Sequence, residues 1–206
     1  MSSSPVLCLA YRHHELSGIR ASISEDILRY LTKSPENLAA GDTFKQRLSA
    51  FLTPELLCLF LYRVAHLLWV NQWHRLAALV SRFNLLVHKV NITSQSCIGP
   101  GCRLPHPAGV TFHGRAGRGL TLFSLAVCCT SENCLEGPVE AGPRLGDRVT
   151  VGGHSVLMGP ISVGDDSKIS FSVRLQSDAP PGVVVICKSL PQIRRPVTTG
   201  DTVRSA

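Results

Sequence analysis

Among the 206 residues of this chain, His106 is the side chain best suited to chemistry. It lies within the segment LPHPAGV, residues 104–110. The unperturbed pKa of an imidazole is about 6.5, so a neutral histidine can accept a proton from a hydroxyl at neutral pH. A rigid backbone would hold the ring in a fixed place. A lone histidine is equally compatible with a structural role, so His106 by itself does not identify a reaction.

Metal binding is the other chemistry that histidines offer. His113 and His154 are the further histidines in the same half of the chain, and His113 lies seven residues after His106. A repeat protein that binds a metal, such as a gamma-class carbonic anhydrase, needs three converging histidines, two of them usually in HxxxxH spacing. No such pair occurs between residues 91 and 178. We therefore expect no metal site.

The eight cysteines also show no metal-binding spacing. Cys128, Cys129 and Cys134 lie close together, but no CxxC occurs and no paired histidines follow them. The first residues lack a basic stretch followed by a long apolar one, so we expect a reducing cytoplasmic compartment and cysteines that act as small buried apolar residues.

The net charge favours a partner that carries negative charge. It is +7, with a pI of about 9.2. Cofactor phosphates, an acidic carrier protein and nucleic acid all fit this charge. Nucleic acid fits least, because only 17% of the residues are charged and no basic run is interleaved with aromatics.

Aliphatic residues recur every sixth place in two stretches of the chain, and glycines directly follow several of them. The first stretch contains Ile92, Ile98, Leu104 and Val110, and the second contains Leu145, Val151, Leu157, Val163, Ile169 and Leu175. A unit this short cannot bury its own side chains and must stack on its neighbours. This pattern predicts successive triangular coils of parallel strands over residues 91–178, with the residues of the period pointing inward.

The predicted architecture is α+β, with an N-terminal helical part followed by a β-helix. Residues 130–144 break the period and contain several glycines and prolines, so they are expected to loop out. Ala179-Pro180-Pro181-Gly182 ends the coils, and residues 183–187 form a last strand. The expected domains are residues 1–90, 91–196 and a flexible tail, 197–206.

Four helices are expected before the coils. Ser24 has the features of an N-cap, and residues 1–23 show no clear period. A short helix is expected at 35–41, a longer one from Pro54 to about residue 70 with Thr53 as N-cap, and another from about 73 to 87. The apolar residues of the last are expected to pack inward: Leu76, Leu79, Val80, Phe83 and Leu86. Residues 51–70 are apolar, but Glu55, Arg63 and His66 interrupt them, which favours a buried amphipathic helix over a membrane span.

These features together resemble the serine O-acetyltransferase family of left-handed β-helix acyltransferases. The resemblance covers residues 50–196. Residues 51–66, FLTPELLCLFLYRVAH, are similar to the helical segment that precedes the coils in that family. IGPG at 98–101 and LPHPAGV at 104–110 are similar to its IGxG and LDHxTGxV motifs, and VGGHSVLMGPISVG at 151–164 is similar to a later coil. The resemblance implies that the β-helix is left-handed.

In that family, the histidine that matches His106 is the base that removes the proton from the serine hydroxyl. The aspartate that orients this base is matched here by Asn91, fifteen residues upstream, and the aspartate directly before the base is replaced by Pro105. An asparagine accepts a hydrogen bond but does not offset the charge of an imidazolium. The second active-site histidine of the family and the arginine before it match Gly142 and Ala141.

The groups that bind the acceptor and the cofactor must therefore be partly different. For the acceptor we nominate His113, Glu140 and Arg144. The coil around residues 114–119 is two residues shorter than in the family, and the family's GGTG is replaced by CTSE at 129–132. For coenzyme A the resemblance suggests Gly152, Gly153, Lys168, Lys188, Arg194 and Arg195.

The resemblance implies transfer of an acetyl group from acetyl-CoA to a hydroxyl, with His106 and Asn91 as the catalytic pair in a homotrimer. The acceptor is serine or a serine-like molecule, free or bound to a carrier protein. The alternative is a catalytically inactive β-helix that serves as a binding or assembly partner. No nucleic acid and no membrane are expected as partners.

Overall fold

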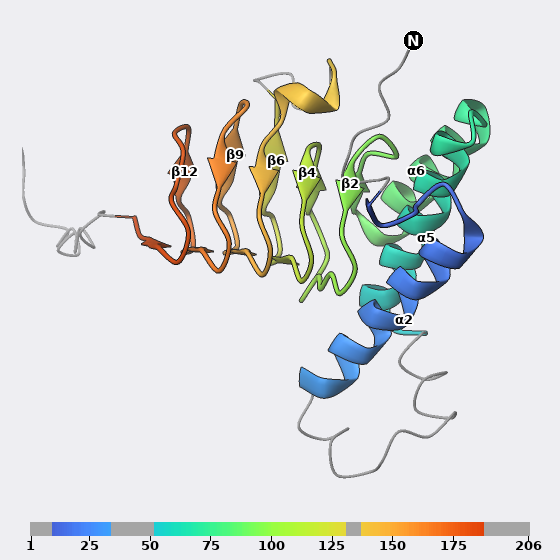
Figure 1. The fold of residues 1–206 in the computed structure, drawn as a ribbon, viewed down its shortest axis with the longest axis horizontal. Coiled ribbons are helices and arrows are strands. Elements are labelled where there is room, and N and C mark those ends of the chain that lie inside the picture. The colour runs from blue at the N-terminus through green and yellow to red at the C-terminus, as the bar shows by residue number, and fades with distance from the viewer. Residues whose placement is uncertain (1–9, 34–51, 131–136, 188–206) are drawn as a thin grey trace, which may run out of the picture.

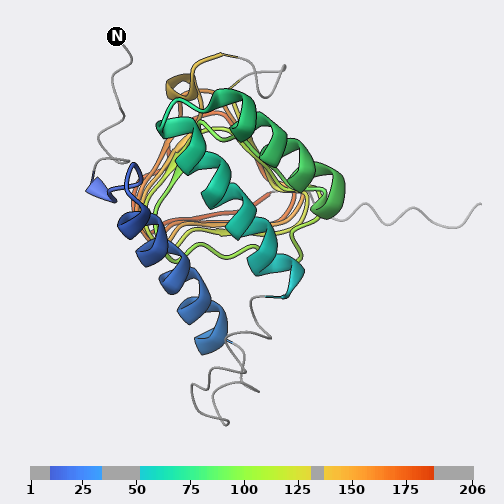
Figure 2. The same ribbon diagram turned by 90° about the vertical axis from the view of Figure 1, so that its right-hand side faces the viewer.

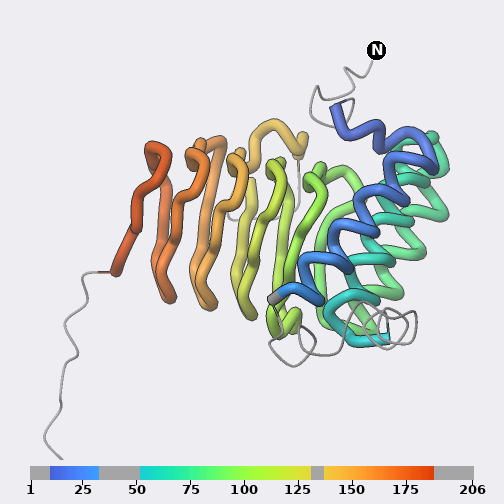
Figure 3. Tube along the Cα trace, turned by 60° about the horizontal axis from the view of Figure 1, so that its bottom comes forward, coloured from blue at the N-terminus to red at the C-terminus, as the bar shows by residue number. Residues whose placement is uncertain are grey.

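The chain folds into a stack of parallel strands with helices packed at one end (Figures 1 and 3). The computed structural model describes residues 10–33, 52–130 and 137–187. No helix among these residues is both long and apolar enough to cross a membrane. The helices are α2 (Leu16–Lys33), α5 (Pro54–Val70) and α6 (His74–His88), with a short 3-10 helix, η1, at Val139–Ala141.

Every strand pairs only in parallel with its neighbours, and each strand is two or three residues long. The strands are β1 (Asn91–Ile92), β2 (Cys97–Ile98), β3 (Thr111–Phe112), β4 (Arg115–Ala116), β5 (Thr121–Leu122), β6 (Val127–Cys129), β7 (Arg144–Leu145), β8 (Thr150–Val151), β9 (Val156–Met158), β10 (Ser162–Val163), β11 (Lys168–Ile169), β12 (Arg174–Leu175) and β13 (Val184–Val185).

The strands form three sheets that enclose a triangular core, and the helices lie across its first coil (Figure 2). The first sheet has the order β1-β3-β6-β9-β12, the second β10-β7-β4-β2 and the third β13-β11-β8-β5. The predicted fold class is confirmed, because the chain passes from helices to stacked parallel coils, and β13 lies within the predicted last strand. Of the predicted loop at 130–144, residues 131–136 lie outside the described part of the chain, residues 137–143 contain η1 and no strand, and Arg144 already begins β7.

The six-residue period holds with one local shift. Ile92, Ile98 and Leu104 are buried as predicted, but the residue paired with Ile92 in the next coil is Phe112, two places after Val110. Val110 is buried too, although it precedes the strand. The next inward position, Ala116, comes only four residues after Phe112. The chain therefore has two more residues than the period requires before β3 and two fewer after it. The second irregularity is the shortened coil that the sequence predicts near residues 114–119.

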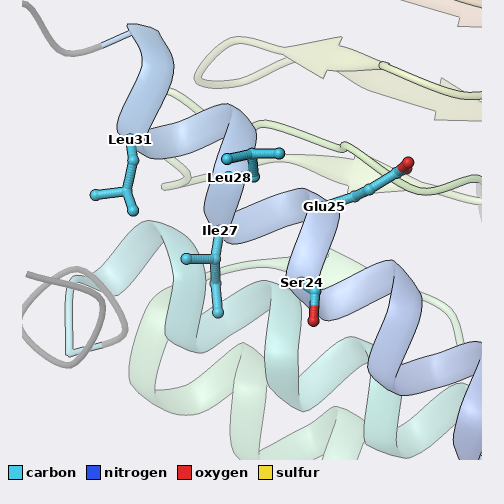
Figure 4. Close-up of a pocket in the computed structure, with 5 residues that line it drawn as sticks. All are labelled: Ser24, Glu25, Ile27, Leu28 and Leu31. Carbon is cyan, nitrogen blue, oxygen red and sulfur yellow. The ribbon is translucent and has the colours of Figure 1, made fainter. Parts of the chain in front are cut away.

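Helix α2 begins earlier than predicted. It starts at Leu16, so Ser24 lies inside the helix and is not its N-cap (Figure 4). The sequence offered a serine followed by two acids, but burial of Ile19, Ser22 and Asp26 along one side extends the helix toward the N-terminus. The short helix expected at 35–41 lies outside the described residues.

Helices α5 and α6 begin close to where the sequence predicts, but the packing of α6 differs. Thr53 precedes α5 in an extended conformation with Pro54 at the first helical position, although its hydroxyl makes no capping hydrogen bond. On α6 the buried residues are Ala77 and Asn84, and Asn84 Nδ2 donates to Cys58 O at 2.9 Å. Most of the large apolar residues expected to pack inward are exposed: Leu76, Leu79, Phe83 and Leu86. The expected orientation of α6 is therefore wrong.

A buried ion pair joins α2 and α5 to the first coil. Arg63 Nε donates to Asp26 Oδ2 at 3.1 Å, and its two terminal nitrogens donate to the carbonyls of Ile98 and Gly99. The second carboxylate oxygen of Asp26 accepts from Cys102 N at 2.7 Å. Burial opposes the charge on Arg63, but the Asp26 carboxylate outweighs it and raises the pKa of Arg63.

Two neighbours of Arg63 on α5 bind the same stretch of backbone. The hydroxyl of Tyr62 donates to Ser96 O at 2.8 Å and accepts from Ile98 N at 3.1 Å. His66 Nδ1 lies 2.8 Å from Ser94 O, and a carbonyl only accepts, so this nitrogen carries a proton. These bonds fix α5 across the open end of the coils.

The cysteines are mostly as expected. Cys58, Cys102, Cys128 and Cys129 are buried thiols, and burial raises the pKa of Cys58 and Cys102 to about 12. Cys97 differs, because it is disulfide-bonded, to a residue outside the described part of the chain. The expectation that every cysteine acts as a buried thiol is therefore wrong for Cys97 and also for Cys187, which is exposed.

Replacing Arg63 by methionine tests the ion pair. Arg63→Met leaves the Asp26 carboxylate buried without its cation, so the free energy of unfolding is expected to fall by about 3–5 kcal/mol. Urea denaturation followed by circular dichroism measures this. The matched control is Arg148→Met, which removes an exposed pair with Asp166 and should leave stability nearly unchanged. Equal, small losses in both variants would contradict the central role of the buried pair.

Candidate active site

His106 lies at an enlarged corner of the first coil. It falls in the turn between β2 and β3, where the chain contains the two extra residues, and its side chain is exposed. Its φ of 54° is left-handed, a conformation that turns the backbone sharply. The extra length moves the turn outward, so the imidazole projects from the prism instead of packing on a neighbouring coil.

The three sheets form a triangular prism, and this corner belongs to one of its long edges. We call it the His106 edge; along it the chain passes from the third sheet to the first. Later coils turn here through Leu125, His154 and Ser172, each with a φ of 58–59°. Backbone hydrogen bonds join successive turns: Leu125 N donates to Ala108 O at 3.2 Å, His154 N to Ser124 O at 3.2 Å and Ser172 N to Gly153 O at 2.9 Å. The structure therefore brings Gly152 and Gly153 to the same edge as His106.

Glu55 is a neighbour of His106 that the sequence analysis did not connect with it. It lies in the first turn of α5, and its Oε1 is 3.5 Å from the backbone nitrogen of His106. The two residues are 51 positions apart, so spacing gave no signal. A carboxylate therefore lies beside the turn that holds His106.

Asn91 begins β1 and pairs in register with Thr111, which follows the His106 corner. Its backbone nitrogen donates to Val110 O at 2.9 Å, and its side chain is half-buried. Among the described residues, no hydrogen bond joins the side chains of Asn91 and His106. Catalytic pairing of these two side chains stays a prediction.

His113 lies at a different edge, the His113 edge, where the chain passes from the first sheet to the second. It is fully buried, and its Nδ1 is 2.9 Å from Thr93 Oγ1. Ser96 Oγ donates to Phe112 O, so Thr93 must donate to Ser96 and accept the Nδ1 proton of His113. Nε2 is then unprotonated and has no hydrogen-bond partner among the described residues. Burial keeps His113 from solvent in this chain.

The other two predicted acceptor residues lie near arginines of the second sheet. Glu140, in η1, forms an ion pair with Arg115 of β4. Arg115 is in register with Arg144 of β7, whose side chain is exposed. The sequence analysis missed Arg115, which now shares this surface with the two predicted residues. None of the three lies at the His106 edge.

The predicted cofactor residues divide into three groups. Gly152 is needed for close coil packing, because a Cβ there would lie 2.7 Å from Phe171 N. Lys168 is exposed on β11, in the third sheet that leads to the His106 edge. Lys188, Arg194 and Arg195 lie outside the described residues. The depression on α2 shown in Figure 4 contains none of the predicted site residues; Ser24, Glu25, Ile27, Leu28 and Leu31 line it.

No family model matches the chain. The curated proteins that it resembles in sequence are named serine acetyltransferase. Over 127 residues the chain is 29% identical to a serine acetyltransferase of Mycobacterium tuberculosis, which covers 61% of this chain and 54% of that protein. Over 137 residues it is 29% identical to a serine acetyltransferase of Helicobacter pylori, covering 66% of this chain and 78% of that protein. At this level of identity the chain resembles these serine acetyltransferases in sequence. It spans about half the length of the Mycobacterium tuberculosis relative.

Solved serine acetyltransferases share the fold. Isoform 3 of Entamoeba histolytica, solved in complex with cysteine, matches with a TM-score of 0.75 and 19% identity over 91% of this chain and 65% of that chain. The Neisseria gonorrhoeae enzyme matches with a TM-score of 0.73 and 21% identity over 87% of this chain and 66% of that chain. At these identities the likeness establishes the fold alone.

The position that matches the second histidine of serine acetyltransferases cannot hold a side chain here. Gly142 packs against the backbone of His113, and a Cβ on it would lie 2.2 Å from His113 O. A histidine at 142 would require the two segments to separate. Gly142 is therefore part of the close packing of the His113 edge.

The buried His113 predicts a pH dependence of stability. Burial lowers the pKa of His113, so below pH 6.5 the unfolded chain binds more protons at this residue than the folded chain. Its contribution to stability is complete above pH 6.5 and is lost as the pH falls below that value, by at most about 1.4 kcal/mol per pH unit. The free energy of unfolding between pH 7 and 5, from urea denaturation, should fall less steeply in His113→Gln. Parallel curves would contradict this.

Proposed function

We propose that this chain is a coenzyme A-dependent O-acetyltransferase that transfers an acetyl group to the hydroxyl of serine or a serine-like acceptor. The observation that carries the proposal is the exposed imidazole of His106, held at an outward corner beside the carboxylate of Glu55. The relatives named serine acetyltransferase support the acetyl donor and the class of acceptor.

The reaction needs one base that later acts as an acid. The neutral imidazole of His106 takes the proton of the acceptor hydroxyl while its oxygen attacks the thioester carbonyl. The tetrahedral intermediate then expels the coenzyme A thiolate, which receives the proton from the His106 imidazolium. The products are the acetyl ester and free coenzyme A. Orientation of both substrates in one complex supplies much of the rate, so a single base is sufficient.

Glu55 takes the electrostatic role that an aspartate has in the family. Asn91 is neutral and cannot stabilise an imidazolium, whereas Glu55 is negative at neutral pH and lies at the same turn as His106. The Glu55 carboxylate stabilises the imidazolium that forms during the reaction. It is a positioning and charge-stabilising residue and does not contact the reacting atoms.

The acceptor is free serine or a serine-like group on a carrier protein. Gly142 and Ala141 provide no charged side chain for the carboxylate of a free amino acid. Arg144 and the pair formed by Arg115 and Glu140 lie at a distinct surface, which suits contacts with a larger partner. The net charge of +7 suits both an acidic carrier and the phosphates of coenzyme A, for which Gly152, Gly153 and Lys168 remain the described candidates.

The proposed assembly is a homotrimer in the cytoplasm, with the acetyl donor in the groove between adjacent β-helices. Such a groove would place the His106 edge of one subunit against its neighbour. The exposed apolar side of α6 favours a further contact, and it is also what a binding or assembly partner without catalytic activity would present. Activity measurements separate the two functions.

Removing the base is the first test. His106→Ala is expected to lower kcat by about 10²–10⁴-fold, the usual contribution of a positioned general base. Release of free thiol from acetyl-CoA measures the rate, with serine, homoserine and a carrier-bound hydroxy amino acid as acceptors. The control is His154→Ala, which removes another exposed histidine of the same edge and should retain turnover.

Either of two results would overturn the proposal. Turnover unchanged in His106→Ala would remove its assigned role. No turnover with any acceptor, together with no binding of coenzyme A by calorimetry, would leave the binding or assembly protein as the function.

A substitution of Glu55 tests its proposed role separately from that of His106. Glu55→Gln removes the charge that stabilises the imidazolium, so kcat should fall about tenfold while KM and the free energy of unfolding stay close to those of the unchanged protein. The matched control is Glu25→Gln, which removes a carboxylate paired with Arg118 at another place on the surface. A fall in kcat that is accompanied by an equal loss of stability, or an unchanged kcat, would contradict this role.

A further inference from the structure

Three buried side chains that the proposed reaction does not use converge beneath the helices. His13 precedes α2, His66 lies on α5 and Cys97 begins β2. Their exposed fractions are 0%, 1% and 0%. One nitrogen of each imidazole and the Cys97 sulfur all lie within 4.8 Å of one another. Metal-ligand atoms from three separate segments therefore share one small volume.

The spacing fits a tetrahedral ion. His13 Nδ1 and Cys97 Sγ are 3.7 Å apart, and two ligands of a tetrahedral zinc at ordinary Zn–N and Zn–S bond lengths lie about 3.6 Å apart. The two imidazole rings are perpendicular, with centroids 5.2 Å apart. Two stacked rings would point their lone pairs in the same direction, whereas two perpendicular rings allow both lone pairs to point at one ion.

The hydrogen bonds of the two histidines determine which ring nitrogen of each carries the lone pair that can bind a metal. His66 Nδ1 donates to Ser94 O at 2.8 Å, so its Nε2 carries the lone pair. Ser22 Oγ donates its one proton to Gly18 O at 3.0 Å, so it accepts from His13 Nε2 at 3.3 Å. The lone pair of His13 is then on Nδ1, the atom near Cys97. Ligating histidines are usually oriented by such outer hydrogen bonds.

Both histidines are neutral at neutral pH, which is the form that binds a metal. Burial, with a smaller effect from the Arg63 charge, lowers the pKa of His13 to about 3. Burial also lowers the pKa of His66 to about 4. The nearby positive charge of Arg63 is held by Asp26, which limits its repulsion of a bound cation.

We propose that, in the reduced protein, His13, His66 and the thiolate of Cys97 bind a zinc ion. Two imidazoles and one thiolate form a ligand set that suits zinc. These three residues supply three ligands, and water takes the fourth position. The ion joins the segment before α2 to α5 and the first coil, so its role is structural.

The disulfide of Cys97 and the zinc ion exclude each other. A phosphine or a dithiol reduces the disulfide to two thiols, with the reductant oxidised to a phosphine oxide or a cyclic disulfide. The Cys97 thiol then releases its proton as the sulfur bonds to zinc. Oxidised protein should therefore contain no zinc at this site. No metal-binding motif marks this site, because the three ligands are 53 and 31 residues apart in the chain.

Metal loading of the full chain tests the site. Protein reduced with a phosphine, incubated with zinc chloride and passed through a desalting column should contain one zinc per chain by mass spectrometry of the metal. Cobalt(II) in place of zinc should give the near-ultraviolet absorption of a thiolate-to-cobalt charge transfer. Cys97→Ser and His13→Gln should each lower zinc affinity at least about 100-fold in a chelator competition.

Matched variants separate ligation from general destabilisation. Cys58→Ser changes another buried cysteine of the same region, whose sulfur already donates to Glu55 O, and should retain zinc. Ser22→Ala removes the hydrogen bond that orients His13 and should weaken zinc binding about 10–100-fold. If reduced protein retains no zinc, or if the folded Cys97→Ser variant binds it as tightly, the proposal is wrong. A cobalt spectrum without thiolate charge transfer would also overturn it.

Discussion

The arrangement of the molecule depends on a buried charge that must be neutralised. Among the described residues Arg63 is the largest fully buried side chain, and its hydrogen bonds are accepted by Asp26 of α2 and by the backbone carbonyls of Ile98 and Gly99. A buried guanidinium without these partners would be strongly unfavourable, so α5, α2 and the coil can assemble in only one register. Glu55 lies two helical turns before Arg63 on the same helix. The ion pair therefore also fixes where the Glu55 carboxylate meets the His106 corner.

The His106 corner shows how a repetitive fold produces a distinct site. Every coil turns at this edge through a residue with positive φ, whether leucine, histidine or serine, so the strained backbone is a property of the edge. What distinguishes the first coil is its two additional residues before β3, together with the helix that covers it. Length moves the turn outward, and α5 supplies a charge that no later coil receives. The regular coils form a rigid support, and the two additional residues of the first coil produce the exposed corner at His106.

The sequence predicted the coils well because the residues that recur every sixth place are the ones whose side chains point into the core. It predicted α5 and the ends of α6 from capping residues and from the change of period near residue 90. It failed where distant contacts decide the outcome. Helix α2 extends past Ser24 because Ile19 and Ser22 are buried, and α6 turns its leucines outward because Asn84 is bonded to α5. Glu55, Arg115 and the cluster around Cys97 carry no local signal, since their partners lie in other segments.

The departures from the serine acetyltransferases lie outside the residues that hold the fold. The inward positions of the period are retained, whereas Pro105 and Gly142 lie in turns between strands and Asn91 begins β1. Gly142 is the informative case, because the backbone of His113 occupies the place where a Cβ would lie. A second histidine could not be restored there by a single substitution. The close packing at Gly142 belongs to the His113 edge, whereas the exposed His106 lies at the other edge of the first sheet. The two edges are separate, so a substitution at one of them need not change the geometry of the other.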